Sequence, residues 1–305
     1  SQLADYIHCI PCQLPWGLRV INQIVPIFSG GGTKLSAHIG ILDAIHTLGI
    51  DFQHIVGVSG GSIVAALHSS GMPLEQIKQL AMDTSFKKFR GFSLLTLIFH
   101  GGLSSGDAFE RWIDAQLQGK LFKDIDKDLH ILATDVNGGG PIVFNKQNSP
   151  DLKISKAVRF SMSIPLFFSF QSYKDYILVD GAILSEDALF RDWAGDNTRV
   201  ICFRLKSDHI TSQNFKKSWL PLGQYVMMLI RTFMTALSRE YVHDDYWKNT
   251  IVVNTGTLSP VDFNISMEQK EKLYRIGYQT ALEFIPKRLS LQLIGRGYIV
   301  TDKPL

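Results

Sequence analysis

The stretch VGVSGGSIVAAL, from Val56 to Leu67, places an apolar run, a serine between glycines and a helix-forming run one after another. Its centre, Gly57-Val58-Ser59-Gly60-Gly61, matches the pattern G-x-S-x-G. In this pattern the serine lies on a sharp strand-to-helix turn, where glycines avoid Cβ atoms that would clash. The stretch therefore predicts either an ordinary tight turn or a nucleophile elbow that presents the Ser59 hydroxyl, and the rest of the chain has to decide between them.

Apolar runs and helical patterns alternate on both sides of this stretch. Apolar residues recur every three or four positions from Leu35 to Leu48, which predicts a helix, and a second helix is expected over about 61–70. Since the strands between them are apolar throughout, we expect a sheet buried on both faces, that is, an α/β fold with a largely parallel sheet. The expected strands are Ile24–Phe28, His54–Val58, Leu129–Val136, Pro141–Asn145, Tyr176–Asp180, Arg199–Leu205 and Thr250–Thr255.

Length and composition favour one globular domain over residues 1–305. Hydrophobic residues make up 45% of the chain and charged residues 19%, a balance that supplies a core and argues against disorder. No repeat or charged linker divides the sequence. We expect a motif-bearing core over about 25–190, and a part from 191 to 305 that completes the fold and is a candidate lid or interface. A helix over about 266–284, begun by a capping box of Ser266 and Gln269, is expected to pack on the sheet.

Charge and cysteine content narrow the classes of partner and compartment. The net charge of +3 gives no support for binding a nucleic-acid polymer, which requires a strongly basic face. Three cysteines are too few for a disulfide scaffold, and the pair Cys9 and Cys12, with only His8 beside it, lacks the further ligands of a zinc site. No apolar run reaches the length of a membrane span, and the start lacks the pattern of a secretory signal. We therefore expect no metal or other cofactor, and a cytoplasmic location.

A second glycine-rich turn follows the strand before the elbow. Gly30, Gly31 and Gly32 let backbone N–H groups converge on an anion, which is either a phosphate or the oxyanion of an acyl intermediate. Neither G-x-x-x-x-G-K-[ST] nor G-x-G-x-x-G is present, so the oxyanion interpretation is favoured. Lys34 would add positive charge near the site or pair with a neighbouring carboxylate. Both turns are expected at the carboxyl edge of the sheet, where active sites of such folds lie.

A serine nucleophile needs a base. The sequence YILVDGA places Asp180 at the end of an apolar strand and before Gly181, and we expect it at the same sheet edge as Ser59. There it could take the serine proton directly, since burial raises the basicity of a carboxylate. The plain alternative is a turn. His209 and His243 follow the later strands and are the candidates for the base of a Ser-Asp-His triad.

Taken together, SGGGTK, GVSGGS and DGA, in that order, resemble the motifs of the patatin-like phospholipases. ATDVNGG and AVRFSMSIPLFF look like the segments between the two catalytic residues of bacterial members. The resemblance implies a three-layer α/β/α fold, a dyad of Ser59 and Asp180, an oxyanion hole from the glycine trio with a basic residue at Lys34, and hydrolysis of lipid acyl esters without a metal. Leu35 departs from the family, which often has glycine there.

Two stretches are candidates for contact with a phospholipid membrane. FKKFRGFSLLTLIF, from Phe86 to Phe99, sets a basic cluster beside an apolar run, which suits an anionic interface. The stretch from Leu222 to Tyr241 is apolar at helical spacing and rich in methionine. Both patterns are also typical of ordinary packing. We expect a peripheral enzyme at the membrane.

Three rival functions stay open at this point. One is a regulated lipase effector, for example in antiphage defence, held closed until an activating small ligand such as a cyclic nucleotide, a partner or an oligomer opens it. The second is an α/β-hydrolase that uses His209 or His243. The third is an inactive binding module, which the intact serine, aspartate and glycine trio argue against.

Overall fold

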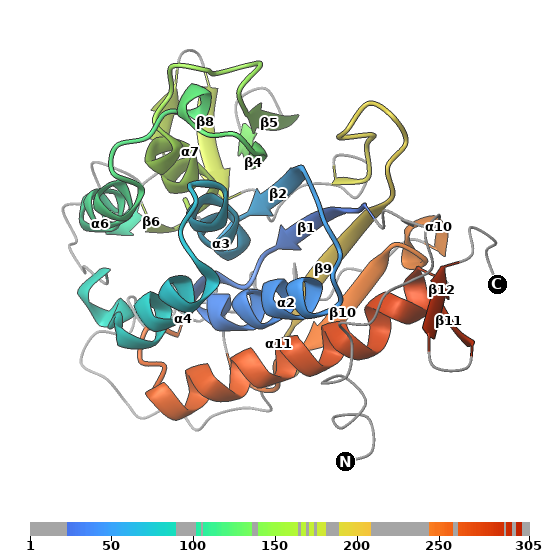
Figure 1. Cartoon of the computed structure of the whole chain (residues 1–305). Helices are drawn as coiled ribbons and strands as arrows, with labels where there is room; N and C mark the ends of the chain where they lie inside the picture. The colour runs from blue at the N-terminus through green and yellow to red at the C-terminus, as the bar shows by residue number, and fades with distance from the viewer. Residues whose placement is uncertain are drawn as a thin grey trace.

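The computed structural model describes residues 23–89, 102–104, 106–135, 140–163, 166–168, 171–173, 176–180, 189–208, 244–258, 262–289, 291–294 and 297–300. Mostly apolar segments form the strands of its central sheet, apart from the short polar β7, and amphipathic or glycine-led segments between them form helices (Figure 1). The sheet strands are β1 (Val25–Ser29), β2 (His54–Val58), β4 (Asp128–Asp135), β5 (Gly140–Phe144), β7 (Gln171–Tyr173), β8 (Tyr176–Asp180), β9 (Val200–Lys206) and β10 (Thr250–Asn254).

The helices and the remaining short elements occupy the connections. The α-helices are α2 (Leu35–Thr47), α3 (Gly60–Ser69), α4 (Leu74–Asp83), α6 (Asp107–Leu117), α7 (Ile154–Ser161), α10 (Asp244–Trp247) and α11 (Met267–Arg288). Short 3-10 turns are η1 (Gly32–Lys34), η2 (Phe86–Phe89) and η3 (Phe122–Asp124). Strands β3 (Gly102–Ser104) and β6 (Leu166–Phe168) pair with each other, as do β11 (Leu291–Ile294) and β12 (Gly297–Val300).

The central sheet is mostly parallel, as the sequence predicts. Its strand order is β10-β9-β1-β2-β4-β8-β7, with β5 paired to β4. The run from β10 to β4 is parallel throughout. Strands β5, β7 and β8 join by antiparallel pairing. The predicted α/β class with a central, mostly parallel sheet flanked by helices is confirmed. Strand β8, at whose end Asp180 lies, runs antiparallel to β4.

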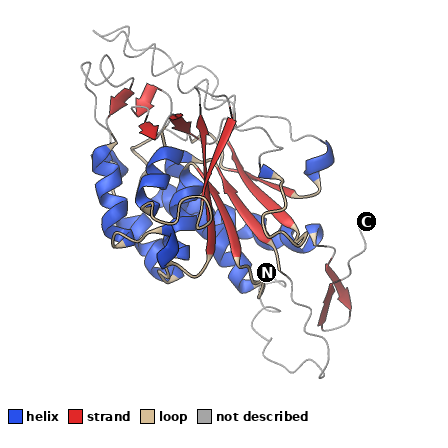
Figure 2. Cartoon of the chain, turned by 90° about the horizontal axis from the view of Figure 1, so that it is seen from above, coloured by secondary structure: helices blue, strands red, loops and turns tan. Residues whose placement is uncertain are grey.

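Alternation along the strands builds a core on each face of the sheet. On one face Phe28 of β1, Ile55 of β2 and Phe203 of β9 belong to the large core beneath the helices. On the other, Ile27 and Val56 belong to a smaller cluster with Leu189 and Trp193. Most of the described helices gather on one side of the strands, as Figure 2 shows. On the second face, α10 stacks its Tyr246 ring on Phe190.

The C-terminal helix α11 begins with the predicted capping box, in which Ser266 and Gln269 bond each other's backbone amides. It runs beside α2 rather than simply against the sheet (Figure 1). The two helices approach so closely that a Cβ on Gly40 would lie 2.1 Å from the Tyr274 carbonyl oxygen, and one on Gly277 would lie 2.0 Å from that of Ala37. Helix α2 is thereby fixed between the sheet and α11, which in turn fixes the glycine turn at its start.

Candidate active site

Strand β2 ends at Val58, and Ser59 lies on a strained turn before α3. Its backbone has φ 53° and ψ −128°, a region that non-glycine residues rarely adopt. Its carbonyl accepts bonds from the Ser62 amide, at 2.9 Å, and from the Ser62 hydroxyl, at 2.6 Å. The turn that the sequence predicts is therefore present, with the strained conformation typical of a nucleophile elbow.

The glycines of the elbow are required by close packing. A Cβ on Gly57 would lie 2.6 Å from the Ser62 Cα, and one on Gly61 would lie 2.1 Å from the Phe28 carbonyl oxygen. A Cβ on Gly60 would lie 2.4 Å from the carbonyl oxygen of Gly32. The elbow thus rests directly on β1 and on the glycine turn that follows it, and only glycine allows this approach.

The glycine trio lies at the same edge as the elbow, as the sequence predicts. All three residues have positive φ, of 75° at Gly30, 95° at Gly31 and 51° at Gly32. The Gly30 amide donates to the Val58 carbonyl at 3.1 Å, which ties this turn to the end of β2. Since Gly30 uses its N–H in this way, the amides of Gly31 and Gly32 are the better candidates of the trio for binding an oxyanion.

His38 holds the glycine turn from below, a role that the sequence analysis missed. Its ring is fully buried against Phe28, and its Nε2 lies 3.0 Å from the Gly30 carbonyl oxygen. Burial lowers the pKa of His38 to about 4, so the neutral ring donates from Nε2 to that carbonyl. A polar residue within the apolar stripe of Leu35, Ile39 and Leu42 was the signal that could have identified it.

Lys34 is also fully buried, but its ammonium binds hydroxyl groups. It donates to Ser207 at 2.6 Å and to Thr255 at 2.7 Å, just beyond β9 and β10. Burial lowers the pKa of Lys34 to about 7. The alternative pairing with a carboxylate is not observed among the described residues. Lys34 thus joins the glycine turn to two neighbouring strand ends, and a part in the oxyanion hole stays a prediction.

The turn after α7 covers the elbow from the other side. The Ser161 hydroxyl accepts the Ser59 amide at 2.8 Å and donates to the Leu132 carbonyl of β4 at 2.5 Å. The Met162 sulfur lies 3.8 Å from the Ser59 hydroxyl oxygen. Ser59 has no exposed surface in this arrangement. The segment containing Ser161 drew attention only through the family resemblance, which gave it no role.

Strand register sets the backbone of Asp180 close to that of Ser59. Strand β2 pairs with β4 up to Val58 and Leu132, and β8 pairs with β4 from Asp180 and Ala133. Strand β5 pairs with β4 over residues 131–135, a range that overlaps the pairing of both β2 and β8. Since β5 occupies one edge of β4 there, β2 and β8 both lie along the other edge. Their ends therefore meet there, opposite neighbouring residues of β4 that are about 3.3 Å apart along the strand.

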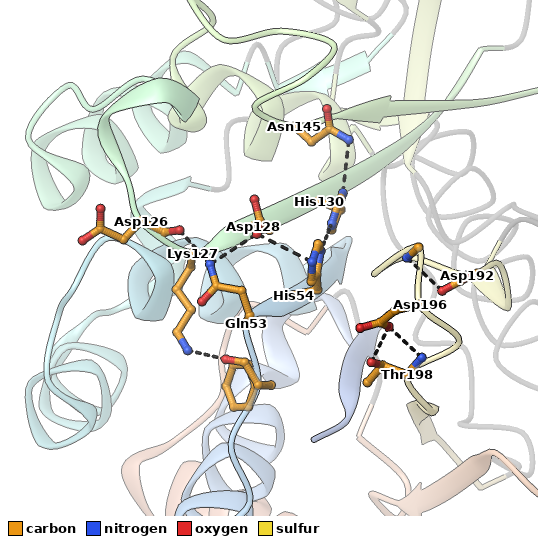
Figure 3. A network of polar contacts seen from close by, with 12 residues as sticks. Gln53, His54, Asp126, Lys127, Asp128, His130, Asn145, Asp192, Asp196 and Thr198 are labelled. Atoms are coloured by element: carbon orange, nitrogen blue, oxygen red, sulfur yellow. Dashed lines mark hydrogen bonds and ion pairs between the residues drawn. The ribbon is translucent and has the colours of Figure 1, made fainter. Parts of the chain in front are cut away.

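The amino edge of the sheet carries a separate polar network (Figure 3). His54 Nδ1 lies 3.1 Å from His130 Nε2, and Asn145 Nδ2 lies 3.1 Å from His130 Nδ1. Asp128 approaches the other nitrogen of His54 at 3.6 Å. Burial, followed by the charge of His54, lowers the pKa of His130 to about 4. This network begins at His54 and Asp128, where β2 and β4 start, and extends to His130, which pairs with Val56.

Other parts of the described chain add little to this site. A cavity of about 470 Å³ lies at the far ends of α2 and α3, beside His46 and His68. Among the described residues there is no group of three or more histidine, cysteine, aspartate or glutamate side chains that could hold a metal ion. None of the described helices has the length and apolar character needed to cross a bilayer.

Several predicted features lie outside the described residues. They are Cys9, Cys12 and His8, the loop glycine Gly181, the alternative bases His209 and His243, the stretch from Leu222 to Tyr241, and most of the stretch from Phe86 to Phe99. At the described start of the latter stretch, Phe86 and Phe89 are buried while Lys87 and Lys88 are exposed. These two aromatic side chains pack in the core rather than facing a membrane.

Comparison with known proteins decides the family. The chain matches the model of the patatin-like phospholipases over residues 27–191, more than half of its length. The chain belongs to the patatin-like phospholipase family. As a member it is a carboxylic ester hydrolase, and the matched region contains the glycine turn, the elbow and β8.

Two relatives match this chain along most of their length, and a solved structure shares its fold. The chain is 27% identical to the uncharacterised protein YqhO of Bacillus subtilis (strain 168), across 82% of this chain and 94% of YqhO. It is 28% identical to the uncharacterised protein R571 of Acanthamoeba polyphaga mimivirus, across 86% and 93%. The crystal structure of VipD from Legionella pneumophila has a TM-score of 0.61 at 14% identity, covering 87% of this chain and 67% of VipD, and so shares the fold.

Proposed function

We propose that this patatin-like phospholipase releases fatty acids from membrane phospholipids or lysophospholipids, with Ser59 as nucleophile and Asp180 as base. The observation that carries the proposal is the strand register. Val58 and Asp180 pair with neighbouring residues of β4 on one edge, so the elbow and the end of β8 meet. The strain at Ser59 supports the same assignment, because such strain is retained where the surrounding structure enforces it, often at catalytic residues.

The reaction follows the chemistry of a serine and a carboxylate. Asp180 takes the hydroxyl proton of Ser59 while the Ser59 oxygen bonds to the acyl carbonyl carbon. Amides of Gly31 and Gly32 donate to the oxyanion. The ester C–O bond then breaks, and Asp180 returns the proton to the departing alkoxide. A water next gives a proton to Asp180 and attacks the acyl-enzyme, and Ser59 leaves with that proton as the fatty acid is released.

The burial of Ser59 favours an opening step before the reaction. With no exposed surface at Ser59 and the Met162 sulfur beside its hydroxyl, an acyl chain enters only after the Met162 side chain moves. A lipid surface or an activating ligand would supply that step, which keeps the regulated effector as the second candidate. The effector predicts release that rises on adding a cyclic dinucleotide, whereas an interfacial enzyme predicts release on vesicles alone.

The test is fatty-acid release from mixed phospholipid vesicles, measured by mass spectrometry. Ser59→Ala and Asp180→Asn are each expected to lower release at least about a thousand-fold while remaining folded. Ser69→Ala is the matched serine control, since Ser69 is buried at the other end of α3 and its hydroxyl has no hydrogen-bond partner among the residues that the structure describes. Asp128→Asn, at the beginning of β4, is the matched carboxylate control. Equal losses in the controls, or full activity of Asp180→Asn, would exclude the dyad.

The histidine alternative is tested in the same assay. His209→Ala and His243→Ala are expected to retain wild-type release, because the proposed base is the carboxylate. Loss of release with either folded variant would instead favour a Ser-Asp-His triad. A fluorophosphonate probe reports on the nucleophile without a lipid, and covalent labelling at Ser59 is the expected result.

A further inference from the structure

The Ser161 side chain links β2 to β4 at the point where their backbone pairing ends. The Ser161 hydroxyl accepts the Ser59 amide at 2.8 Å and donates to the Leu132 carbonyl at 2.5 Å, and all three residues are buried without exposed surface. It therefore bridges the two strands one step beyond their last pair, Val58 and Leu132. A single hydroxyl from α7 thus fixes the backbone nitrogen of the elbow to β4.

This bridge stands where β4 changes partner. Leu132 faces β2, and the next residue, Ala133, faces Asp180 of β8 along the same edge. The Ser161 hydroxyl donates to the carbonyl of Leu132, and Leu132 directly precedes Ala133, the residue that pairs with Asp180. A shift of the Ser59 amide relative to this carbonyl changes the separation between the elbow and the end of β8. The bond network around Ser161 therefore sets the alignment of the two strand ends.

The bond from the Ser59 amide to Ser161 helps to maintain the strained backbone conformation of Ser59. With φ 53° and ψ −128°, the residue relaxes toward a common backbone conformation unless its amide and carbonyl are held. The carbonyl is held by Ser62 through two bonds, and the amide is held by Ser161. Loss of the Ser161 hydroxyl would remove this bond to the Ser59 amide.

We propose that Ser161 is a positioning residue, whose hydroxyl holds Ser59 in its strained conformation and in line with the end of β8. This inference rests on the proposed function, since it assigns Ser161 a part in the same reaction. Ser161 acts through the Ser59 amide and does not take part in proton transfer. Its loss is therefore expected to slow acylation while leaving the binding of the lipid nearly unchanged.

The chain supplies a closely matched control two residues away. The Ser163 hydroxyl also accepts one bond and donates one, from Arg159 Nη1 at 2.7 Å and to the Arg159 carbonyl at 2.9 Å. It is equally buried, and its bonds stay within α7 and the turn that follows. Ser161→Ala and Ser163→Ala each remove a buried hydroxyl with two bonds, so both lower stability, but only Ser161→Ala is expected to slow the reaction.

The experiment measures kcat, KM and the rate of labelling by a fluorophosphonate probe in the full chain. We expect Ser161→Ala to lower both kcat and the labelling rate about ten- to a hundred-fold with KM changed less than about twofold, because small displacements of reacting groups cost rates of this size. Ser163→Ala is expected to stay within about threefold of wild type. Ser161→Thr keeps the hydroxyl and should restore most of the rate, and Ser161→Cys, with a weaker donor, should lie between.

The outcomes separate this inference from the proposed function. Equal rate losses in Ser161→Ala and Ser163→Ala, or a change in KM alone, would overturn the positioning role while leaving the dyad in place. If the threonine variant does not fold, the cysteine and alanine variants still order the labelling rates. A wild type that labels at Ser59 in a Ser161-dependent way but releases no fatty acid would contradict the proposed lipid substrate and support the positioning role. Absence of labelling at Ser59 would contradict both.

Discussion

The two edges of the sheet hold polar groups in different ways. At the carboxyl edge, backbone groups and hydroxyls surround Ser59, glycines bring the elbow against β1, and one residue is strained. At the amino edge, side chains bond to one another, with the imidazoles of His54 and His130 between a carboxylate and an amide. The comparison teaches that a dense titratable cluster is not what marks this enzyme's proposed site. Close backbone approach and local strain mark it instead.

The first test of the difference between the two edges concerns how tightly the carboxyl edge is packed. Gly61→Ala places a Cβ 2.1 Å from the Phe28 carbonyl oxygen, so we expect the free energy of unfolding to fall by about 3 kcal/mol or more. Gly71→Ala meets an unfavourable φ of 89°, which Gly61 does not have, but open space around it, and should cost only about 1 kcal/mol. Urea unfolding followed by circular dichroism measures both. Similar losses would mean that the elbow tolerates displacement.

The second test concerns the amino edge and its response to acid. His130 has a pKa of about 4 in the folded protein against 6.5 for the free side chain. The unfolded chain therefore binds more protons between pH 6.5 and pH 4, and stability falls as the pH falls through this window. His130→Gln should reduce the loss of stability between pH 7 and pH 4.5 by about 2 kcal/mol.

Activity sharpens this second test. The folded His130→Gln variant at pH 7 should release fatty acid at the wild-type rate, because the His130 ring bonds His54 and Asn145 and not the elbow. Urea midpoints at the two pH values and the vesicle assay give the two measurements. A variant that is stable but inactive would show that the amino edge takes part in the reaction, and the distinction between the edges would fail.

The smallest effect is expected from releasing the strain at the elbow. Ser59→Gly allows φ 53° and ψ −128° at little cost, so the variant should be more stable than wild type by about 1 kcal/mol while losing activity. Ser69→Gly, within the regular helix α3, should instead lose about 1 kcal/mol. Thermal unfolding of the three proteins gives the comparison. A destabilised Ser59→Gly would mean that the bonds of the hydroxyl outweigh the strain.

Local patterns predicted much of the fold and the elbow. The spacing of glycines around Ser59 reflects close contacts with Phe28 and Ser62, and a sharp strand-to-helix turn requires such glycines, so the motif can be recognised in a short stretch. The capping box of α11 is equally local. The direction of β8 was not predictable in this way, because an apolar strand such as YILVD fits parallel and antiparallel pairing alike.

The supporting residues depend on contacts between distant parts of the chain. Ser161 meets Ser59 across 102 positions, and Lys34 meets Ser207 across 173. Neither distance leaves a periodic signal in the sequence. His38 lies nearer to its partner Gly30, but a histidine in an apolar helix face is most simply an ordinary core residue. The sequence thus indicated the groups proposed to react, but it did not indicate Ser161 or His38, and it named Lys34 without its hydroxyl partners.

The shared edge of β4 also has a consequence for how members of this family can diverge. Because Asp180 is placed by its pairing with Ala133, its position depends on register and not on the number of residues between Asp135 and Tyr176. Insertions or deletions in the loops of that connection leave the two strand ends facing each other, provided that they spare β5, α7 and the Ser161 bridge. A slip of one residue in the pairing of β8, by contrast, would turn Asp180 to the opposite face of the sheet. Motif order is therefore a better guide than motif spacing for finding distant relatives.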